Sequence, residues 1–554
     1  MSKREATAID ALAEKYFEET VAASPILLTQ LGSEQRQDEY DDFTPAEAER
    51  RYQRNKKLLA DLAALTPVDD VDAVTVSAIN ERIGLAAETH ETYNDLMEIN
   101  GISSGLAEIR SVYEMMPTDT AEQCETIVRR LHALPTAVEQ WSARQLAGIE
   151  SGHAPAARQV KLLIEQATGW TQQGAFFDTL AAAVAPKLTN EYRDKLAAGV
   201  ANAKEAYRWA VKRLSDEILP LATPTDGVGE ELYQLKSRDF LGTTIDVRAM
   251  YEWGKQQVAE LDELQRETAA ILRPGMSVTE TKKSLDDDPK YQIVGTDNLL
   301  KWMQTTIAEA LQALTGTHFD IPEPMQTLRP RIAPTTDGGI WYTSPSDDFA
   351  RPGQMWWSVT PDAKSFGTWS ELTTVYHEGV PGHHMQLAYA VYLKETLNSY
   401  RRFGAWTSGH GEGWALYAES LMSELGFLED PGHRLGMLDA QAMRAARVVI
   451  DIGVHCGFEA PVEVGGGEWT FEKALAFYKN HCYMAEGQAL FEVNRYFGWP
   501  GQAPAYKIGQ KEWLELRAEM QRRQGATFNL KDFHMKALAV GGVGLDTLKF
   551  ALLG

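Results

Sequence analysis

Hydrophobic residues recur every three or four positions along most of the chain, and this spacing predicts a mainly helical protein. The pattern is clearest between 188 and 219, where one apolar stripe runs through seven positions: Leu196, Val200, Ala203, Tyr207, Val211, Leu214 and Ile218. Thr189 precedes this stripe and is a suitable N-cap. Residues 246–272 and 296–314 show the same periodicity, with the charged stretch LDDDPKY as a loop between them.

A further helix start is indicated by Thr120, which is followed by Gln123 three positions later in the pattern of a capping box. We expect this helix to end at Pro135, because proline removes a backbone N–H and clashes with the preceding turn.

The helical spacing of hydrophobic residues is interrupted between 328 and 360. Here RPRIAP, GGIWYTS and QMWWSVT are short segments with aromatic or β-branched residues, separated by Pro, Gly and Asp, and they indicate strands. Helical spacing resumes at Ser370 and continues to the end. The expected fold is therefore mainly α, a large helical body around a cleft with a small β-sheet beside the helix that begins near Ser370. The Pro- and Gly-rich segment 220–231 divides an N-terminal helical subdomain (1–225) from a second one (226–554), or is a loop within one continuous domain.

Composition narrows the function. Hydrophobic residues make up 44% of the chain and charged residues 24%, which are ordinary globular values. A net charge of −24 leaves no basic excess for phosphates or anionic lipid, so we expect neither nucleic acid nor a membrane as partner. The charged N-terminus lacks a signal-like apolar run, and three cysteines are too few for a disulfide framework, so the expected location is the cytoplasm.

Seven of the twelve histidines lie within 377–481, and they centre on ELTTVYHEGVPGHHMQLAYAVYL. His377 and Glu378 form an HE pair, and His383 and His384 follow a Pro-Gly break. Catalytic zinc takes neutral imidazoles and a carboxylate and keeps one position open. A carboxylate beside the first ligand can accept a proton from water, so we expect Zn²⁺ as cofactor and Glu378 as general base.

The spacing departs from HExxH, in which two histidines four residues apart share one helical face. A gap of six cannot do this on an ideal helix, at about 100° per residue. Pro381 and Gly382 permit a break that would return His383 to the side of His377. We therefore predict His383 as the second ligand, with His384 supporting the site without binding the metal.

The segment EGWALYAE supplies Glu412 and Glu419, seven apart on one helical face. It resembles NEGFAxYxE of the aminopeptidase-N-like gluzincins, in which the first Glu binds zinc. The resemblance implies Glu412 as third ligand, and Glu419 as acceptor of the free N–H of a ligand histidine. The alternative is two helices with buried, hydrogen-bonded histidines and surface glutamates that hold no metal.

RAARVVIDIGVH places Arg447, Asp451 and His455 on one helical stripe. In a functional interpretation, Arg447 contacts substrate, Asp451 supports the site, and His455 donates to the oxyanion that forms when water attacks a carbonyl. An Arg447–Asp451 surface pair is the structural alternative.

Three residues further from the HE pair are weaker candidates. Tyr506 is a second oxyanion donor by analogy with the gluzincin tyrosine, or a packed aromatic residue at a helix start. Arg495 binds a substrate carboxylate through its planar fork, or pairs with Glu492. Tyr342, which belongs to a group of aromatic residues with Trp341, Trp356 and Trp357, lines the substrate cleft or packs in the core.

Together, HEGVPGHHMQ, EGWALYAE, RVVIDIGVH and RYFGWPGQAPAYKIG resemble the bacterial family catalogued as domain of unknown function 885, most specifically over about 340–520. The resemblance implies a mostly helical, zinc-peptidase-like fold and leaves the substrate open. One departure is the long segment CGFEAPVEVGGGEWTFEKA after His455.

The function expected from these features is a zinc metallopeptidase that hydrolyses short peptides. A zinc hydrolase of other amides or esters needs the same residues, and a non-catalytic helical binding protein with a vestigial site is the third alternative. The intact Glu378 disfavours the third. No oligomeric state follows from the sequence.

Overall fold

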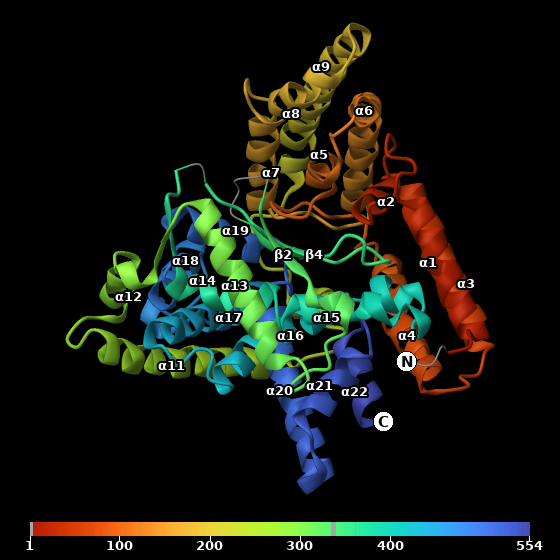
Figure 1. The fold of residues 1–554 in the computed structure, drawn as a ribbon. Coiled ribbons are helices and arrows are strands. Elements are labelled where there is room, and N and C mark those ends of the chain that lie inside the picture. The colour runs from red at the N-terminus through yellow and green to blue at the C-terminus, as the bar shows by residue number, and fades with distance from the viewer. Residues whose placement is uncertain (1–3, 334–338, 361) are drawn as a thin grey trace.

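The structure is a computed structural model that describes residues 4–333, 339–360 and 362–554. It is mainly helical, as expected (Figure 1). The α-helices are α1 (Ala8–Ala23), α2 (Pro25–Gln30), α3 (Pro45–Ala63), α4 (Asp70–Glu91), α5 (Gly105–Met115), α6 (Ala121–Glu150), α7 (Ala157–Trp170), α8 (Phe176–Val184), α9 (Asn190–Arg213), α10 (Glu230–Leu241), α11 (Val247–Leu272), α12 (Val278–Asp286), α13 (Thr296–Leu314), α14 (Thr368–Glu378), α15 (His383–Tyr392), α16 (Ser408–Glu424), α17 (Pro431–Cys456), α18 (Phe471–His481), α19 (Glu486–Gly498), α20 (Ala505–Gln524), α21 (Leu530–Leu538) and α22 (Leu545–Leu553).

Local signals place several of these helices where the spacing predicts them. Thr189 caps α9 by accepting a hydrogen bond from the backbone N–H of Tyr192, and Thr120 forms the expected capping box with Gln123 at the start of α6. The expected end of α6 at Pro135 is wrong, because the helix continues through this proline to Glu150. The turn after Pro135 carries completely buried side chains such as Val138 and Trp141, and their packing offsets the missing hydrogen bond.

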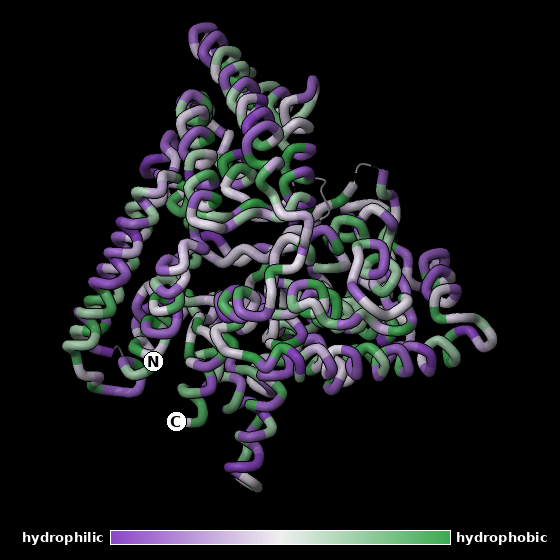
Figure 2. Tube along the Cα trace, turned by 180° about the vertical axis from the view of Figure 1, so that it is seen from behind, coloured by the Kyte–Doolittle hydropathy of each residue, from purple (hydrophilic) through white to green (hydrophobic). Residues whose placement is uncertain are grey.

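The buried hydrophobic residues form two large cores. One lies among α2 and α5 to α9 and extends in sequence from Ile26 to Ile218. These helices make the upper body in Figure 1. The other core joins α1, α3 and α4 to the helices after 230. Figure 2 shows hydrophilic positions along the outer helices and hydrophobic positions gathered inside both bodies. The first body ends just before the expected boundary at 225, but α1, α3 and α4 pack with the second; the division into two subdomains stays a prediction.

The expected small sheet is present beside α14 and α15. It has three strands, β2 (Leu328–Ile332), β3 (Ile340–Thr343) and β4 (Gly353–Trp357), in the order β2-β4-β3, with β2 parallel and β3 antiparallel to β4. Residues 334–338 of the predicted sheet segment lie outside the described residues. A separate antiparallel pair joins β1 (Gln292–Val294) to β5 (Ser365–Gly367).

Side chains fasten the three-stranded sheet to the helices behind it. Trp357 on β4 donates a hydrogen bond to Glu371 on α14 (3.1 Å), and the Tyr342 hydroxyl on β3 lies 2.9 Å from His384 Nδ1 on α15. The sheet thus supports the start of α15, where the histidine motif lies. Across the described residues, we find no helix with the length and apolarity needed to cross a membrane.

Candidate metal centre

The histidine motif is split between two helices. α14 ends at Glu378 and α15 begins at His383, with residues 379–382 as a sharp connection. This connection needs glycine at 382, since a Cβ there would lie 1.9 Å from the His377 carbonyl oxygen. The result is that His383 returns to His377: their ring centroids are 4.9 Å apart, with the planes at 88°.

A tryptophan on the following helix holds this connection in place. Trp414 on α16 is completely buried, and its indole N–H lies 2.9 Å from the Pro381 carbonyl oxygen and 3.1 Å from that of Gly382. The same helix carries Glu412 two residues earlier. One contact therefore sets the position of the helix break relative to Glu412.

His377, His383 and Glu412 form the group of potential metal ligands in the described part of the chain, with their ligand atoms within 4.8 Å of one another. Glu412 Oε2 is 3.2 Å from His377 Nε2 and 3.4 Å from His383 Nε2. Ligands at about 2.0–2.1 Å from a tetrahedral zinc ion lie about 3.3 Å apart. The two separations from Glu412 match that value.

A buried carboxylate orients the first of these histidines. Glu419 Oε1 accepts the Nδ1–H of His377 at 2.8 Å, and its Oε2 accepts the hydroxyl hydrogen of Thr373 at 2.6 Å. Glu419 lies seven residues after Glu412 on the same face of α16, as the spacing predicts. Because Glu419 holds the Nδ1–H, Nε2 is the nitrogen of His377 that faces Glu412, and it can bind a metal ion that takes the place of its proton.

The second histidine is held differently. His383 Nδ1 is buried and has no hydrogen-bond partner among the described residues. A ligand histidine usually donates this N–H to a neighbouring group. His383 is positioned instead by the backbone of the helix start.

Charge within the cluster also fits a cation. Burial acts to lower the pKa of His377, but its hydrogen bonds with Glu412 and Glu419 outweigh burial and raise it to about 9. Burial acts to raise the pKa of Glu412, whereas the adjacent His383 and His377 bring it well below its ordinary value. The buried Glu419 and the partly buried Glu412 around two imidazoles thus demand positive charge, and a divalent ion would supply it in place of protons. The donor set, two imidazoles and one carboxylate, suits zinc.

Glu378 adds an unused carboxylate at the same place. It is buried, and its Oε2 has no hydrogen-bond partner among the described residues. Burial raises its pKa, while His383 and His377 act to lower it. A buried carboxylate with a raised pKa and a free oxygen can take up a proton and release it again.

Arg444 on α17 is a residue that the sequence interpretation missed. Its charge lowers the pKa of both Glu378 and Glu419, so it faces the carboxylate side of the cluster. Its position three residues before Arg447 in RAARVVIDIGVH was the available signal. Thr373, four residues before His377 on the same face of α14, was detectable from helical periodicity in the same way.

His384 is turned away from the cluster. Its Nε2–H donates to the Met325 carbonyl oxygen at 2.7 Å, and its Nδ1 accepts from the Tyr342 hydroxyl at 2.9 Å. Both nitrogens are used, so His384 makes no hydrogen bond with the three grouped residues, contrary to the expected supporting position. The reason is the rotation of about 100° between consecutive helical residues. Tyr342, which was expected to contact substrate, donates its hydroxyl hydrogen to His384 instead.

His455, which was expected to donate to the oxyanion, makes its hydrogen bond elsewhere. Its Nε2–H donates to the Tyr496 carbonyl oxygen at 2.7 Å, so this N–H is not available to an oxyanion. Burial lowers its pKa to about 4 and keeps the ring neutral. Asp451 accepts hydrogen bonds from the Tyr233 hydroxyl (2.6 Å) and the Gly501 N–H (2.9 Å), and it forms no ion pair with Arg447.

The two arginines expected to bind substrate share one carboxylate. Arg447 donates to Glu492 (2.7 Å) and to the Tyr496 hydroxyl (2.9 Å), while Arg495 lies 3.2 Å from the other oxygen of Glu492. Burial acts to raise the pKa of Glu492, but the two guanidinium groups lower it to about 2. The ion pair of Arg495 with Glu492, which was the alternative to substrate binding, is thus present. Tyr506 is partly buried, with its ring 4.8 Å from the Arg447 guanidinium, and its role as oxyanion donor stays a prediction.

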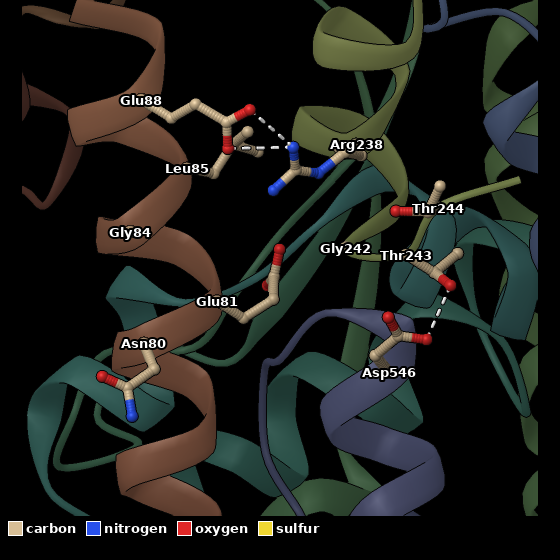
Figure 3. A pocket seen from close by; sticks show the side chains of 10 residues that line it. All are labelled: Asn80, Glu81, Gly84, Leu85, Glu88, Arg238, Gly242, Thr243, Thr244 and Asp546. Carbon is tan, nitrogen blue, oxygen red and sulfur yellow. Dashed lines mark hydrogen bonds and ion pairs between the residues drawn. The ribbon is translucent and has the colours of Figure 1, made fainter. Parts of the chain in front are cut away.

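A polar hollow elsewhere does not contribute to the cluster. It lies where α4, α10 and α22 meet (Figure 3). Its charged groups satisfy one another: Arg238 pairs with Glu88 at 2.9 Å, and the Thr243 hydroxyl donates to Asp546 at 2.6 Å. Glu81 pairs with Arg82. None of its lining residues belongs to the histidine motif.

Comparison with known proteins gives the fold and the family. A structure titled "The crystal structure of the putative lipoprotein from Colwellia psychrerythraea" is similar with a TM-score of 0.84 and 23% identity over 98% of both chains. Another, from Shewanella oneidensis and described as a putative lipoprotein of unknown function, has a TM-score of 0.74 and 17% identity over 99% of this chain and 100% of that one. No curated protein matches this chain. The family described as "Bacterial protein of unknown function (DUF885)" matches residues 25–552, and the chain therefore belongs to the DUF885 family.

Proposed function

We propose that this protein is a zinc-dependent metallopeptidase that hydrolyses short peptides, with His377, His383 and Glu412 as metal ligands. The observation that carries the proposal is the position of Glu378. Its free, buried Oε2 belongs to the residue directly after one ligand, and its pKa is raised by burial. Such a group suits proton transfer, and Glu378 forms no ion pair with any other described residue that would indicate a purely structural purpose.

A zinc ion held by these ligands would polarise the scissile carbonyl and lower the pKa of a nearby water. Glu378 would accept the proton of the attacking water at Oε2 as the new C–O bond forms. It would then deliver that proton to the amide nitrogen as the C–N bond breaks, so the carboxylate is regenerated. Glu419 keeps the Nδ1 proton on His377, and Arg444 limits the rise of the Glu378 pKa.

The likeness of EGWALYAE to the gluzincin segment supports the same ligand set, and the gap between His377 and His383 is closed here by a helix break. A hydrolase of non-peptide amides or esters would use the same proton transfers. The experiment must therefore vary the substrate as well as the residue.

The test is Glu378→Gln assayed against a mixed-peptide library together with panels of small amides and esters. The amide keeps the shape of the carboxylate but accepts no proton, so we expect a loss of activity of about 10²–10⁴-fold with zinc content and folding unchanged. Peptide cleavage by the parent protein at least tenfold faster than cleavage of the other classes is the predicted result. Loss of zinc in the variant would make Glu378 a ligand, and full activity would exclude it as the base.

A further inference from the structure

A second cavity lies behind the helix that carries Glu412 and Glu419. It measures about 410 Å³ and is formed by α11, α16, α17 and α20. Its lining residues are Trp253, Gln257, Leu261, Ser420, Met437, Leu438, Gln441, Lys507, Gln510, Lys511, Leu514 and Glu515. The size is within the lower range of small-molecule sites. His377, His383, Glu412 and Glu378 do not line it.

The cavity contains a buried amine. Lys507 is only 6% exposed, and its Nζ lies 2.8 Å from Gln441 Oε1 and 2.8 Å from Gln510 Oε1. Both acceptors are neutral, and an ammonium group has three donors. Among the described residues, no carboxylate pairs with Lys507. Its positive charge and one N–H are therefore left to be matched.

A second donor at the same place is unused. Gln441 is 3% exposed, and its Nε2 is buried without a hydrogen-bond partner among the described residues. Its oxygen is already occupied by Lys507. Gln510 differs, because its Nε2 donates to Ser420 Oγ at 2.7 Å and to the Leu416 carbonyl oxygen at 3.1 Å. A buried amide N–H without a partner is unfavourable, and an acceptor in the cavity would remove that cost.

The charges around the amine do not provide its partner. Burial lowers the pKa of Lys507 to about 8; Glu419 on α16 and Glu260 on α11 act to raise it, and Arg444 on α17 acts to lower it. Lys511, one turn further along α20, already pairs with Glu515 at 2.6 Å. At neutral pH the amine is mostly protonated, and an anion beside it would be stabilised.

Five lining residues are hydrophobic, and they stand beside the polar Gln257 and Ser420 and the paired Lys511 and Glu515. Trp253 and Leu261 come from α11, Met437 and Leu438 from α17, and Leu514 from α20. A small inorganic anion would contact the amine but leave this surface against water. A ligand with both an acidic head and a hydrocarbon part uses the whole cavity.

We propose that this cavity binds a carboxylate that carries an apolar chain, with the head on Lys507 and Gln441. The same chemistry is present in a short fatty acid and in an apolar amino acid with a blocked amine. The site is independent of the proposed peptidase function, because its lining residues are not part of the metal cluster. Ser420 adjoins Glu419, so the occupied cavity lies next to the carboxylate that orients His377.

The test is calorimetric titration of the full chain at pH 7 with hexanoate and with N-acetylleucine. Hexan-1-ol and acetate are the matched probes that lack the charge and the chain, respectively. We expect at least one of the two carboxylates to bind with a stoichiometry of one per chain. The tighter binder shows whether the cavity takes a short fatty acid or an amino acid with a blocked amine. Hexan-1-ol and acetate should bind at least tenfold more weakly. Affinity should fall as pH rises through about 8, where Lys507 loses its proton.

Lys507→Met and Gln441→Leu should each reduce carboxylate affinity by tenfold or more, since each removes one donor. Arg522→Met, which removes an exposed cation on the same helix outside the cavity, is the control and should leave affinity unchanged. Glu412→Ala should also leave it unchanged, which separates this site from carboxylate binding at a metal. Circular dichroism verifies folding, and Gln441→Leu remains decisive if Lys507→Met does not fold. No binding to the parent chain, equal binding of hexan-1-ol, or equal loss in Arg522→Met would overturn the proposal.

Discussion

Replacing His383 and His384 one at a time separates metal binding from folding. The two histidines are adjacent, but His383 belongs to the metal-ligand group, whereas His384 forms hydrogen bonds with Tyr342 and Met325. In His384→Ala, the Tyr342 hydroxyl and the Met325 carbonyl oxygen lose their common partner inside the protein. An unsatisfied buried group costs about 1–3 kcal/mol, so we expect the free energy of unfolding to fall by about 2–5 kcal/mol, including the space left by the ring. The folded variant should retain its zinc.

In His383→Ala, no comparable network is lost, since His383 Nδ1 has no partner. We expect a change in unfolding free energy, measured on metal-free protein, of about 1–2 kcal/mol or less, and loss of most metal affinity, because one of three protein ligands is removed. The assays are urea denaturation of chelator-treated protein and zinc titration against a fluorescent chelator. Retained zinc in His383→Ala together with lost zinc in folded His384→Ala would refute the assignment.

Two further results are expected. Glu419→Gln should weaken zinc affinity by about 10–100-fold while the fold is kept, because the amide holds His377 Nδ1–H without the negative charge; unchanged affinity in a competition titration would contradict this. Burial lowers the pKa of His455 to about 4, below the 6.5 of an unfolded histidine, so the unfolded chain binds the proton more readily than the folded one. The neutral ring therefore contributes about 3 kcal/mol to the free energy of unfolding above pH 6.5, and this contribution is lost as the pH falls toward 4. The decrease in unfolding free energy from pH 7 to pH 5 should therefore be larger in the parent protein than in His455→Gln. An equal decrease in both proteins would argue against a neutral, buried His455.

Local signals in the sequence were sufficient to predict many of the helices. Periodicity locates α9, α11 and α13, and capping side chains mark the starts of α9 and α11, because a helix start depends on a few neighbouring side chains. Pro135 shows the limit of that approach. Its local preference is overruled by the burial of Val138 and Trp141, which depends on helices distant in sequence.

The same division applies to the candidate site. His377, His383 and Glu412 come together as expected, because a helix break at Pro381 and Gly382 has direct geometric consequences. The surroundings of His455 and Arg447 were not predictable in this way.

Those two side chains are held by Tyr496 and Glu492 on α19, more than forty residues later in the chain. The spacing within α17 carries no information about that contact. It places residues on a stripe, but the element that packs against the stripe is decided by the tertiary fold.

Metal content of the protein, purified without chelator and measured by inductively coupled plasma mass spectrometry, tests the central claim most directly. The arrangement of His377, His383 and Glu412 predicts about one zinc ion per chain, and a large loss of zinc in Glu412→Ala. Protein that contains no transition metal and takes up no added zinc would contradict it.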